Sequence, residues 1–171
     1  MPAVTRKIRR RRVPGELVVE QTRDLALVAE TLAAAGMLAD GVDAAGGCYL
    51  TAYVGDHLAG VIGIEARVDA ALIRSLMVAE TDRRRGIGAT LVAAARTAAH
   101  TRGARTLYAL APDSGAARYF EHFGFTLATS ERLIAALAGA FMVDYLLQRP
   151  DELARCQVLS LDIANDGVIL R

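Results

Sequence analysis

Hydrophobic residues along the chain recur first at strand spacing and then at helix spacing. Residues 16–20 form a short segment rich in valine and leucine, which predicts a strand. The polar residues 22–24 then precede apolar residues at helical spacing, which predicts a capped helix that Gly36 ends. Two further apolar segments, 48–54 and 58–66, flank a polar turn and predict a hairpin.

The second half of the chain continues this exchange of strand and helix patterns. The predicted elements are a strand over 72–78, a helix from 89 to about 101, a strand over 105–111, a short helix over 113–122, a strand over 125–129, an interrupted helix over 131–148 and a closing strand over 155–163. Strands separated by helices predict an α/β fold in which helices cover both faces of a mixed sheet.

One charged residue interrupts the apolar strand over 72–78. Arg74 alternates with Leu72 and Leu76, which places all three on one face of a regular strand. A buried charge needs a partner. Arg74 either forms an internal ion pair, for which Glu65 is a candidate, or points into a cleft and binds a substrate carboxylate in bidentate fashion.

Composition predicts one domain preceded by a basic tail. The chain has 171 residues, 53% of them hydrophobic, which is enough for one sizeable core. Residues 6–12 carry six positive charges although the whole chain has a net charge of only +1. We therefore expect a disordered, solvated tail over 1–15 and a single domain over 16–171; binding of nucleic acid by residues 6–12 is the less favoured alternative.

Several classes of protein do not fit the sequence. The two cysteines lie far apart and the three histidines are scattered, so we expect neither a metal site nor a disulfide framework. The longest apolar stretch, 133–143, is too short to cross a bilayer. The apolar segment 133–147 that contains it is expected to form core or a homodimer interface. No signal-peptide pattern follows the first arginines, which predicts a cytoplasmic protein.

A basic glycine turn between a strand and an alanine-rich helix is the most informative segment. It reads Arg83-Arg84-Arg85-Gly86-Ile87-Gly88 and lacks the patterns of a Walker loop and of a dinucleotide-binding turn. Glycines let backbone N–H groups converge on an anion, and a helix start adds unpaired donors. The segment therefore predicts a pyrophosphate site.

The turn resembles motif A of the GNAT superfamily of N-acetyltransferases, which bind acetyl-CoA. A second motif supports the resemblance, because residues 113–125 keep Ala116, Gly124 and Phe125 in the frame of the family's Asn-x-x-Ala-x-x-x-Tyr-x-x-x-Gly-Phe. The resemblance covers roughly residues 16–130. It implies the GNAT fold, a mixed central sheet of about six to seven strands that splays apart at the fourth and fifth strands, with the cofactor entering the gap.

The resemblance also implies which residues contact acetyl-CoA. These are Leu76, Met77, Val78, Arg83, Arg84, Arg85, Gly86, Ile87, Gly88, Ala89, Asp113, Ala116 and Phe120. The Val78 N–H is the candidate donor to the oxyanion that forms during transfer.

The second motif departs from the family at two positions. Phe120 stands where many members have the tyrosine that protonates the departing CoA thiolate, and a phenyl ring has no proton to give. Tyr119 is not expected to replace it, because neighbouring residues on a helix point about 100° apart. Asp113 replaces the usual asparagine. Turnover remains feasible without the tyrosine, since a thiol with a pKa near about 8.5 leaves readily.

The general base and the acceptor are less well defined. Glu65 is the favoured base and, with Arg74, a candidate substrate-binding residue; Asp69 and a chain of water molecules are alternatives. A narrower likeness, to small acetyltransferases of free amino acids including arsenic-resistance types, implies an amino-acid-like acceptor.

These observations predict an acetyl-CoA-dependent N-acetyltransferase that transfers acetyl directly to a primary amine of a small molecule. Two other functions stay open at this point. One is a non-catalytic acyl-CoA-binding module, and the other is a nucleic-acid-associated factor that uses the arginine-rich segment 6–12.

Overall fold

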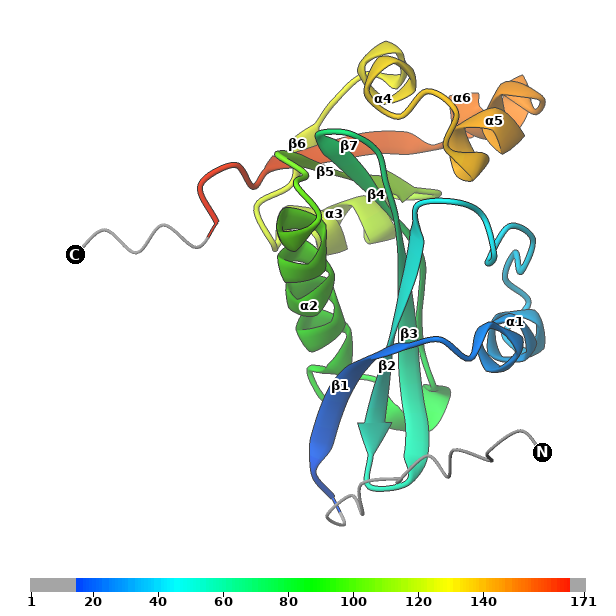
Figure 1. The fold of residues 1–171 in the computed structure, drawn as a ribbon, viewed down its shortest axis with the longest axis vertical. Helices are drawn as coiled ribbons and strands as arrows, with labels where there is room; N and C mark the ends of the chain where they lie inside the picture. The colour runs from blue at the N-terminus through cyan, green and yellow to red at the C-terminus, as the bar shows by residue number, and fades with distance from the viewer. Residues whose placement is uncertain (1–14, 167–171) are drawn as a thin grey trace, which may run out of the picture.

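The computed structural model describes residues 15–166, which form one mixed sheet covered by helices (Figure 1). The predicted basic tail lies outside the described residues except for Gly15, so the division into a tail and a domain stays a prediction. Nucleic-acid binding by residues 6–12 stays a prediction for the same reason.

The sheet has seven strands in the order β1-β2-β3-β4-β5-β7-β6. The strands are β1 Leu17–Thr22, β2 Gly47–Val54, β3 His57–Ala66, β4 Ala70–Val78, β5 Thr106–Ala111, β6 Thr126–Leu127 and β7 Gln157–Asp162. The helices are α1 Leu25–Ala34, α2 Ile87–Thr101, α3 Ser114–Glu121, α4 Ser130–Ala136, α5 Phe141–Leu147 and α6 Pro150–Arg155, with a 3-10 turn over Glu80–Asp82. Neighbouring strands are antiparallel except β4 and β5, which are parallel.

This architecture confirms the predicted α/β fold, and the differences are local. The predicted strand over 125–129 is only two residues long as β6. The predicted helix over 131–148 is interrupted as expected, with Gly139 at φ +77° between α4 and α5. Helix α6, which begins at Pro150, was not predicted as a separate element.

The alternation of side chains along β2 and β3 supplies two cores, one on each face of the sheet. Tyr49 and Val61 pack under α1 against Val28 and Leu32. Their strand neighbours Leu50 and Ile62 point the other way, into the core that α2 and α3 cover. The helices contribute Leu91, Ala95, Ala117 and Phe120 to this core. Helices α4 and α5 lie beyond α1 at the β5–β7 end of the sheet (Figure 1).

A bulge in β4 creates the gap in the sheet. Val61 pairs with Met77 and Gly63 with Arg74, so three steps along β4 oppose two steps along β3. Ser75 absorbs the extra residue with φ at +58°, a conformation that costs a non-glycine residue about 1–2 kcal/mol.

The bulge reverses the faces of the residues that follow it. Leu72 packs in the α4–α5 core, whereas Leu76 packs in the core under α2 and α3. The expectation that Leu76 shares a face with Arg74 is therefore wrong. Pairing of β4 with β5 ends at Ile73 and Ala109, and the two strands separate beyond that point.

The apolar segment predicted as core or homodimer interface is largely buried in its own chain. Leu133, Leu137, Val143 and Leu146 are each at most 5% exposed. Leu147, at 49%, is the exposed large apolar side chain of this segment. The homodimer stays a prediction.

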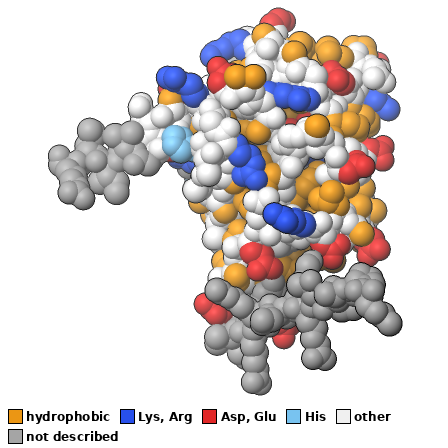
Figure 2. Space-filling view, viewed as in Figure 1, with side chains coloured by type: hydrophobic (Ala, Val, Ile, Leu, Met, Phe, Trp, Pro, Cys, Tyr) orange, Lys and Arg blue, Asp and Glu red, His pale blue; other side chains and the backbone are white. Residues whose placement is uncertain are grey.

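The described surface mixes both signs of charge. On the face in Figure 2, acidic and basic side chains are interspersed among apolar ones. Over residues 15–166, no helix is both long and apolar enough to cross a membrane, and no group of metal-ligating side chains comes together. The cytoplasmic location stays a prediction.

Candidate active site

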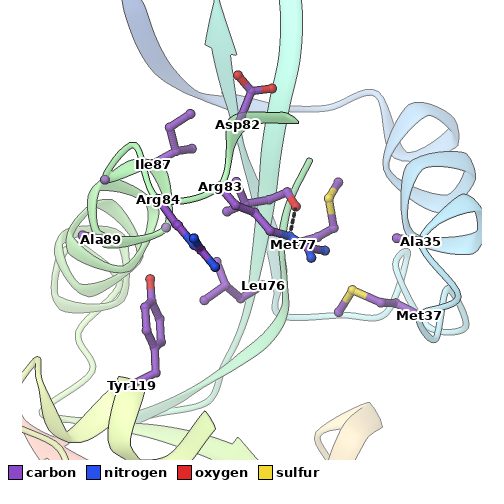
Figure 3. A pocket seen from close by; sticks show the side chains of 13 residues that line it. Ala35, Met37, Leu76, Met77, Asp82, Arg83, Arg84, Ile87, Ala89 and Tyr119 are labelled. Carbon is purple, nitrogen blue, oxygen red and sulfur yellow. Dashed lines mark hydrogen bonds between the residues drawn. The ribbon is translucent and has the colours of Figure 1, made fainter. Parts of the chain in front are cut away.

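The first cavity, of about 460 Å³, lies where β4 leaves the sheet and α2 begins (Figure 3). Figure 3 shows the Arg84 side chain and the Tyr119 hydroxyl directed toward the space in front of Leu76, with Met37 on the α1 side. The cavity brings together nine of the predicted cofactor residues, Leu76, Met77, Val78, Arg83, Arg84, Gly86, Ile87, Gly88 and Ala89.

The start of α2 leaves its backbone N–H groups available to this cavity. Gly86 is the N-cap residue, its φ is +77°, and α2 has no side-chain cap. Arg84 also has a positive φ, at +61°, which tightens the turn before the helix. The first turn carries no acidic residue. Uncapped N–H groups, the helix dipole and nearby arginines together favour an anion.

Gly88 keeps the floor of the cavity open. A Cβ atom at this position would lie 2.4 Å from the Tyr119 hydroxyl oxygen. Any side chain at residue 88 would therefore displace Tyr119 and occupy the space beside the helix start.

Arg85 belongs to the motif but not to the cavity wall. Its Nη1 donates to Asp82 Oδ1 at 2.5 Å, and Asp82 Oδ2 lies 2.8 Å from His57 Nε2. Burial favours the neutral Asp82 carboxyl, but hydrogen bonds with His57 and Thr81 outweigh burial and lower the pKa of Asp82. The ionised Asp82 carboxylate thus connects the turn to the β2–β3 hairpin. Arg85 takes part in this connection through its ion pair with Asp82.

The backbone of Val78 faces the gap between β4 and β5. The next residue, Ala79, donates its N–H to the Ala59 carbonyl at 2.8 Å, across β3. Backbone groups of successive strand residues point to opposite edges, so the N–H and C=O of Val78 point away from β3. The Val78 carbonyl accepts from Arg83 Nε at 3.3 Å on that edge. The Val78 N–H is thus directed toward the gap, as an oxyanion donor requires.

A second cavity, of about 570 Å³, adjoins the first. It lies between the separated ends of β4 and β5 and the α5–α6 segment, with Leu110, Tyr145 and Glu152 in its wall. Met37, Leu76 and Tyr119 line both cavities. A group bound in one cavity can therefore meet a group bound in the other at Leu76.

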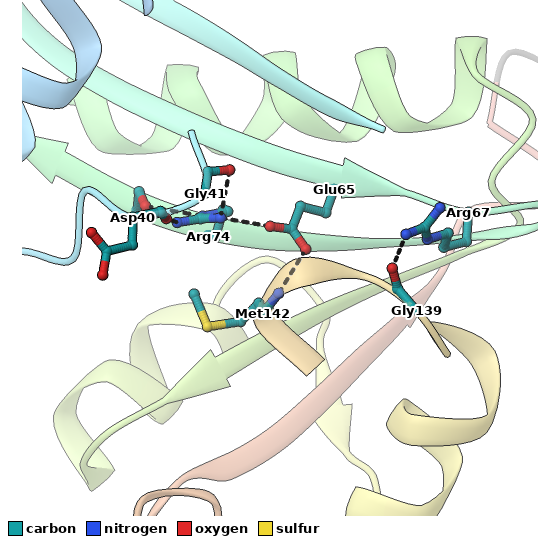
Figure 4. Close-up of polar contacts among 8 residues, drawn as sticks. Asp40, Gly41, Glu65, Arg67, Arg74, Gly139 and Met142 are labelled. Carbon is teal, nitrogen blue, oxygen red and sulfur yellow. Dashed lines mark hydrogen bonds and ion pairs between the residues drawn. The ribbon is translucent and has the colours of Figure 1, made fainter. Parts of the chain in front are cut away.

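The two candidate substrate-binding residues bind each other instead (Figure 4). Arg74 Nη1 donates to Glu65 Oε1 at 2.6 Å, and both side chains are 2% exposed. The Met142 N–H donates to the other Glu65 oxygen at 3.1 Å. Glu65 lines neither cavity.

This geometry decides between the alternatives for Arg74 in favour of the internal ion pair. It also argues against Glu65 as the general base, because a base must reach the proton that it removes. Both carboxylate oxygens of Glu65 are occupied by protein donors and shielded from solvent. Glu65 is placed to hold the β3–β4 pair against α5.

Residues of the second motif either cap α3 or line the second cavity. Asp113 lines neither cavity and caps α3, since its Oδ1 accepts from the Ala116 N–H at 2.8 Å. Ala116 and Phe120 line the second cavity and not the first. Phe120 is 7% exposed and packs edge-on against Phe125.

Tyr119 lies in the candidate site, a position that the sequence reasoning did not predict. It is 39% exposed and lies at the junction of both cavities, whereas Phe120 is largely buried and lines only the second. The side chains of Tyr119 and Phe120 point in different directions, as predicted. It is Tyr119, however, that faces the junction of the two cavities. The pattern of α3 carries a signal for this, because Ala117 and Phe120 form its buried stripe and leave Tyr119 outside it.

Comparisons with known proteins identify the family and the fold. A sequence model of the Acetyltransferase (GNAT) family matches residues 16–125. No curated protein matched the chain.

Solved structures share the fold at low sequence identity. An acetyltransferase from Bacillus subtilis in complex with CoA is 23% identical, with a TM-score of 0.64 over 86% of this chain and 99% of its own. Rv2747 from Mycobacterium tuberculosis, also in complex with CoA, is 17% identical, with a TM-score of 0.63 over 85% and 98%. N-acetylglutamate synthase from Neisseria gonorrhoeae, complexed with CoA and N-acetyl-glutamate, is 17% identical, with a TM-score of 0.63 over 86% of this chain and 35% of its own. With the family match spanning most of the chain, the protein belongs to the GNAT family of acetyltransferases.

Proposed function

We propose that the protein binds acetyl-CoA in the first cavity and transfers the acetyl group directly to a primary amine bound in the second. The observation that carries this proposal is the meeting of the two cavities at Leu76, beside the free edge of β4. A nucleophile and an acyl donor held there need no covalent enzyme intermediate, and holding both in register supplies much of the rate.

The residues of the first cavity fit acetyl-CoA. The uncapped start of α2 with Arg83 and Arg84 offers donors and positive charge for a pyrophosphate. The edge of Leu76, Met77 and Val78 offers backbone groups for the extended pantetheine arm. Acetyl-CoA supplies the thioester whose acyl carbon the amine attacks.

Transfer exchanges a C–S bond for a C–N bond at that carbon. The amine nitrogen contributes the new electron pair, the sulfur departs with the old one, and the nitrogen loses one proton while the sulfur gains one. The Val78 N–H donates to the acyl oxygen as negative charge grows on it. Because Glu65 is sequestered, the ammonium form of the amine loses its proton to water.

We propose that Tyr119, which lines both cavities, returns a proton to the sulfur. Burial raises the pKa of its hydroxyl, which therefore stays protonated at neutral pH. We expect Tyr119→Phe to lower kcat at least about 10-fold while leaving the dissociation constant of acetyl-CoA nearly unchanged.

CoA release under saturating substrates measures this effect. Tyr53→Phe is the control, since it makes the same substitution on β2 at a residue that lines neither cavity. An unchanged kcat in Tyr119→Phe would mean that the thiolate departs without this proton.

Thermal unfolding with acetyl-CoA, followed by a CoA-release assay with a panel of amines, tests the proposed function. Ligand at about 100 times its dissociation constant should stabilise the fold by about 2.7 kcal/mol. Stabilisation without an acetylated product would favour a non-catalytic acyl-CoA-binding module.

The nucleic-acid alternative makes a different prediction. Deletion of residues 1–12 would then abolish nucleic-acid binding and its salt dependence while leaving acetyl-CoA affinity unchanged. Full nucleic-acid affinity after the deletion would argue against a role for the arginine segment.

A further inference from the structure

The wall of the second cavity is mainly apolar. Its volume of about 570 Å³ lies within the range of small-molecule sites. The apolar wall comes from four parts of the chain, and its members include Leu38, Leu76, Leu110, Pro112, Met142 and Leu146. An acceptor bound here gains free energy mainly by burying its own apolar surface.

The cavity has no free positive charge for a carboxylate. Arg74 is the one Lys or Arg among its wall residues, and its side chain is only 2% exposed. Its guanidinium already donates to Glu65 Oε1 at 2.6 Å and to the Asp40 carbonyl at 2.8 Å. Phe141 lies beside the guanidinium, with its ring centroid 5.3 Å from Arg74 Cζ. A substrate carboxylate would have to break the ion pair with Glu65 and leave that acid unpaired.

A negative charge lines the same cavity. The Glu152 side chain is 53% exposed, and Arg149, its ion-pair partner, is 3.8 Å away. The Arg149 guanidinium also stacks on the Tyr145 ring, with Cζ 3.7 Å from the centroid. Burial, with the nearby Glu152 charge, raises the pKa of Cys156, so this wall residue stays neutral. Glu152 is the one carboxylate in this wall, so the wall offers an ion-pair partner to an ammonium group and, with Arg74 occupied, none to a carboxylate.

We infer that the acceptor is a primary amine with an apolar alkyl or aralkyl body and no carboxylate. The inference rests on the proposed function and replaces the amino-acid-like acceptor that the sequence suggested. Arg74 was the candidate ligand for the carboxylate of such an acceptor, and its ion pair with Glu65 occupies it.

Matched pairs of amines and amino acids test the inference. The full chain would be assayed with 2-phenylethylamine against phenylalanine and with 3-methylbutylamine against leucine, which differ only in the carboxylate. We expect kcat/KM to be at least about 10-fold higher for the amine of each pair, because the carboxylate has no partner in the cavity. Equal or higher kcat/KM for the amino acids would overturn the inference.

A charge-neutral variant tests the role of Glu152. Glu152→Gln should raise KM for both amines severalfold. It should also lower the ratio of kcat/KM for each amine to kcat/KM for the matching amino acid. Glu121→Gln, an exposed change on α3 that lines neither cavity, is the matched control and should behave like the wild type. Unchanged KM in Glu152→Gln would remove the electrostatic part of the inference.

Thermal unfolding of the same samples separates the two proposals. Without stabilisation by acetyl-CoA, the proposed function itself fails. If acetyl-CoA stabilises the protein but neither 2-phenylethylamine nor 3-methylbutylamine is acetylated, the acceptor class is wrong while the cofactor site stands.

Discussion

Gly88→Glu is expected to weaken acetyl-CoA binding at least about 100-fold, because it places a carboxylate at the helix start where the pyrophosphate would bind. The new side chain also meets Tyr119, since even a Cβ would lie 2.4 Å from its hydroxyl oxygen. Tyr119 is 39% exposed and can move, so we expect the fold to survive. Isothermal titration of wild type and variant with acetyl-CoA measures the effect.

Thr90→Glu is the matched control for Gly88→Glu. It adds the same side chain two residues later on α2, at an exposed position that does not line the cavity. Its acetyl-CoA affinity should stay close to that of the wild type. If both variants lost affinity equally, a general charge effect rather than occupation of the cavity would be the cause.

Arg74→Met is expected to lower the free energy of unfolding by about 3–5 kcal/mol, because it leaves the Glu65 carboxylate buried without its cationic partner. The double variant Glu65→Leu, Arg74→Met should recover much of this loss, since neither charge is then buried alone. Denaturant unfolding of the single and double variants gives the comparison.

An exposed arginine provides the control for this prediction. Arg118→Met on α3 makes the same substitution at the surface, where changes are usually within about 0.5 kcal/mol. A loss in Arg74→Met no larger than in Arg118→Met would contradict a structural role for the pair.

A catalytic role of Glu65 predicts a different result. Glu65→Gln would then lower kcat and alter its pH profile while the free energy of unfolding stayed the same. We expect the reverse, a loss of stability with a small effect on kcat in the folded fraction.

Most of the fold was predictable because local sequence patterns indicate most of its strands and helices. The turn at Gly55 between two apolar segments predicted the β2–β3 hairpin, and the alanine-rich run after Gly88 predicted α2. The bulge at Ser75 was not predictable in this way. Leu72, Arg74 and Leu76 keep a regular alternation in the sequence, and only pairing with β3 shows that one residue is extra.

The sequence by itself determined the family and predicted the residues of the first cavity, the half of the candidate site that we propose binds acetyl-CoA. That half is built largely from one continuous segment, 76–89, whose strand, turn and helix start are all set by neighbours in the chain. Local patterns suffice for such a site, because backbone conformation decides where its N–H groups point.

Only the tertiary structure decided the second cavity, the half of the candidate site that we propose binds the acceptor. Its wall combines Met37, Leu110, Met142 and Glu152, which are distant in sequence and meet through the splay of β4 and β5. The availability of Arg74 likewise depended on whether packing brought Glu65 and the Asp40 carbonyl against it. Whether a charge is free or already paired is a property of its three-dimensional surroundings, and no pattern along the chain expresses it.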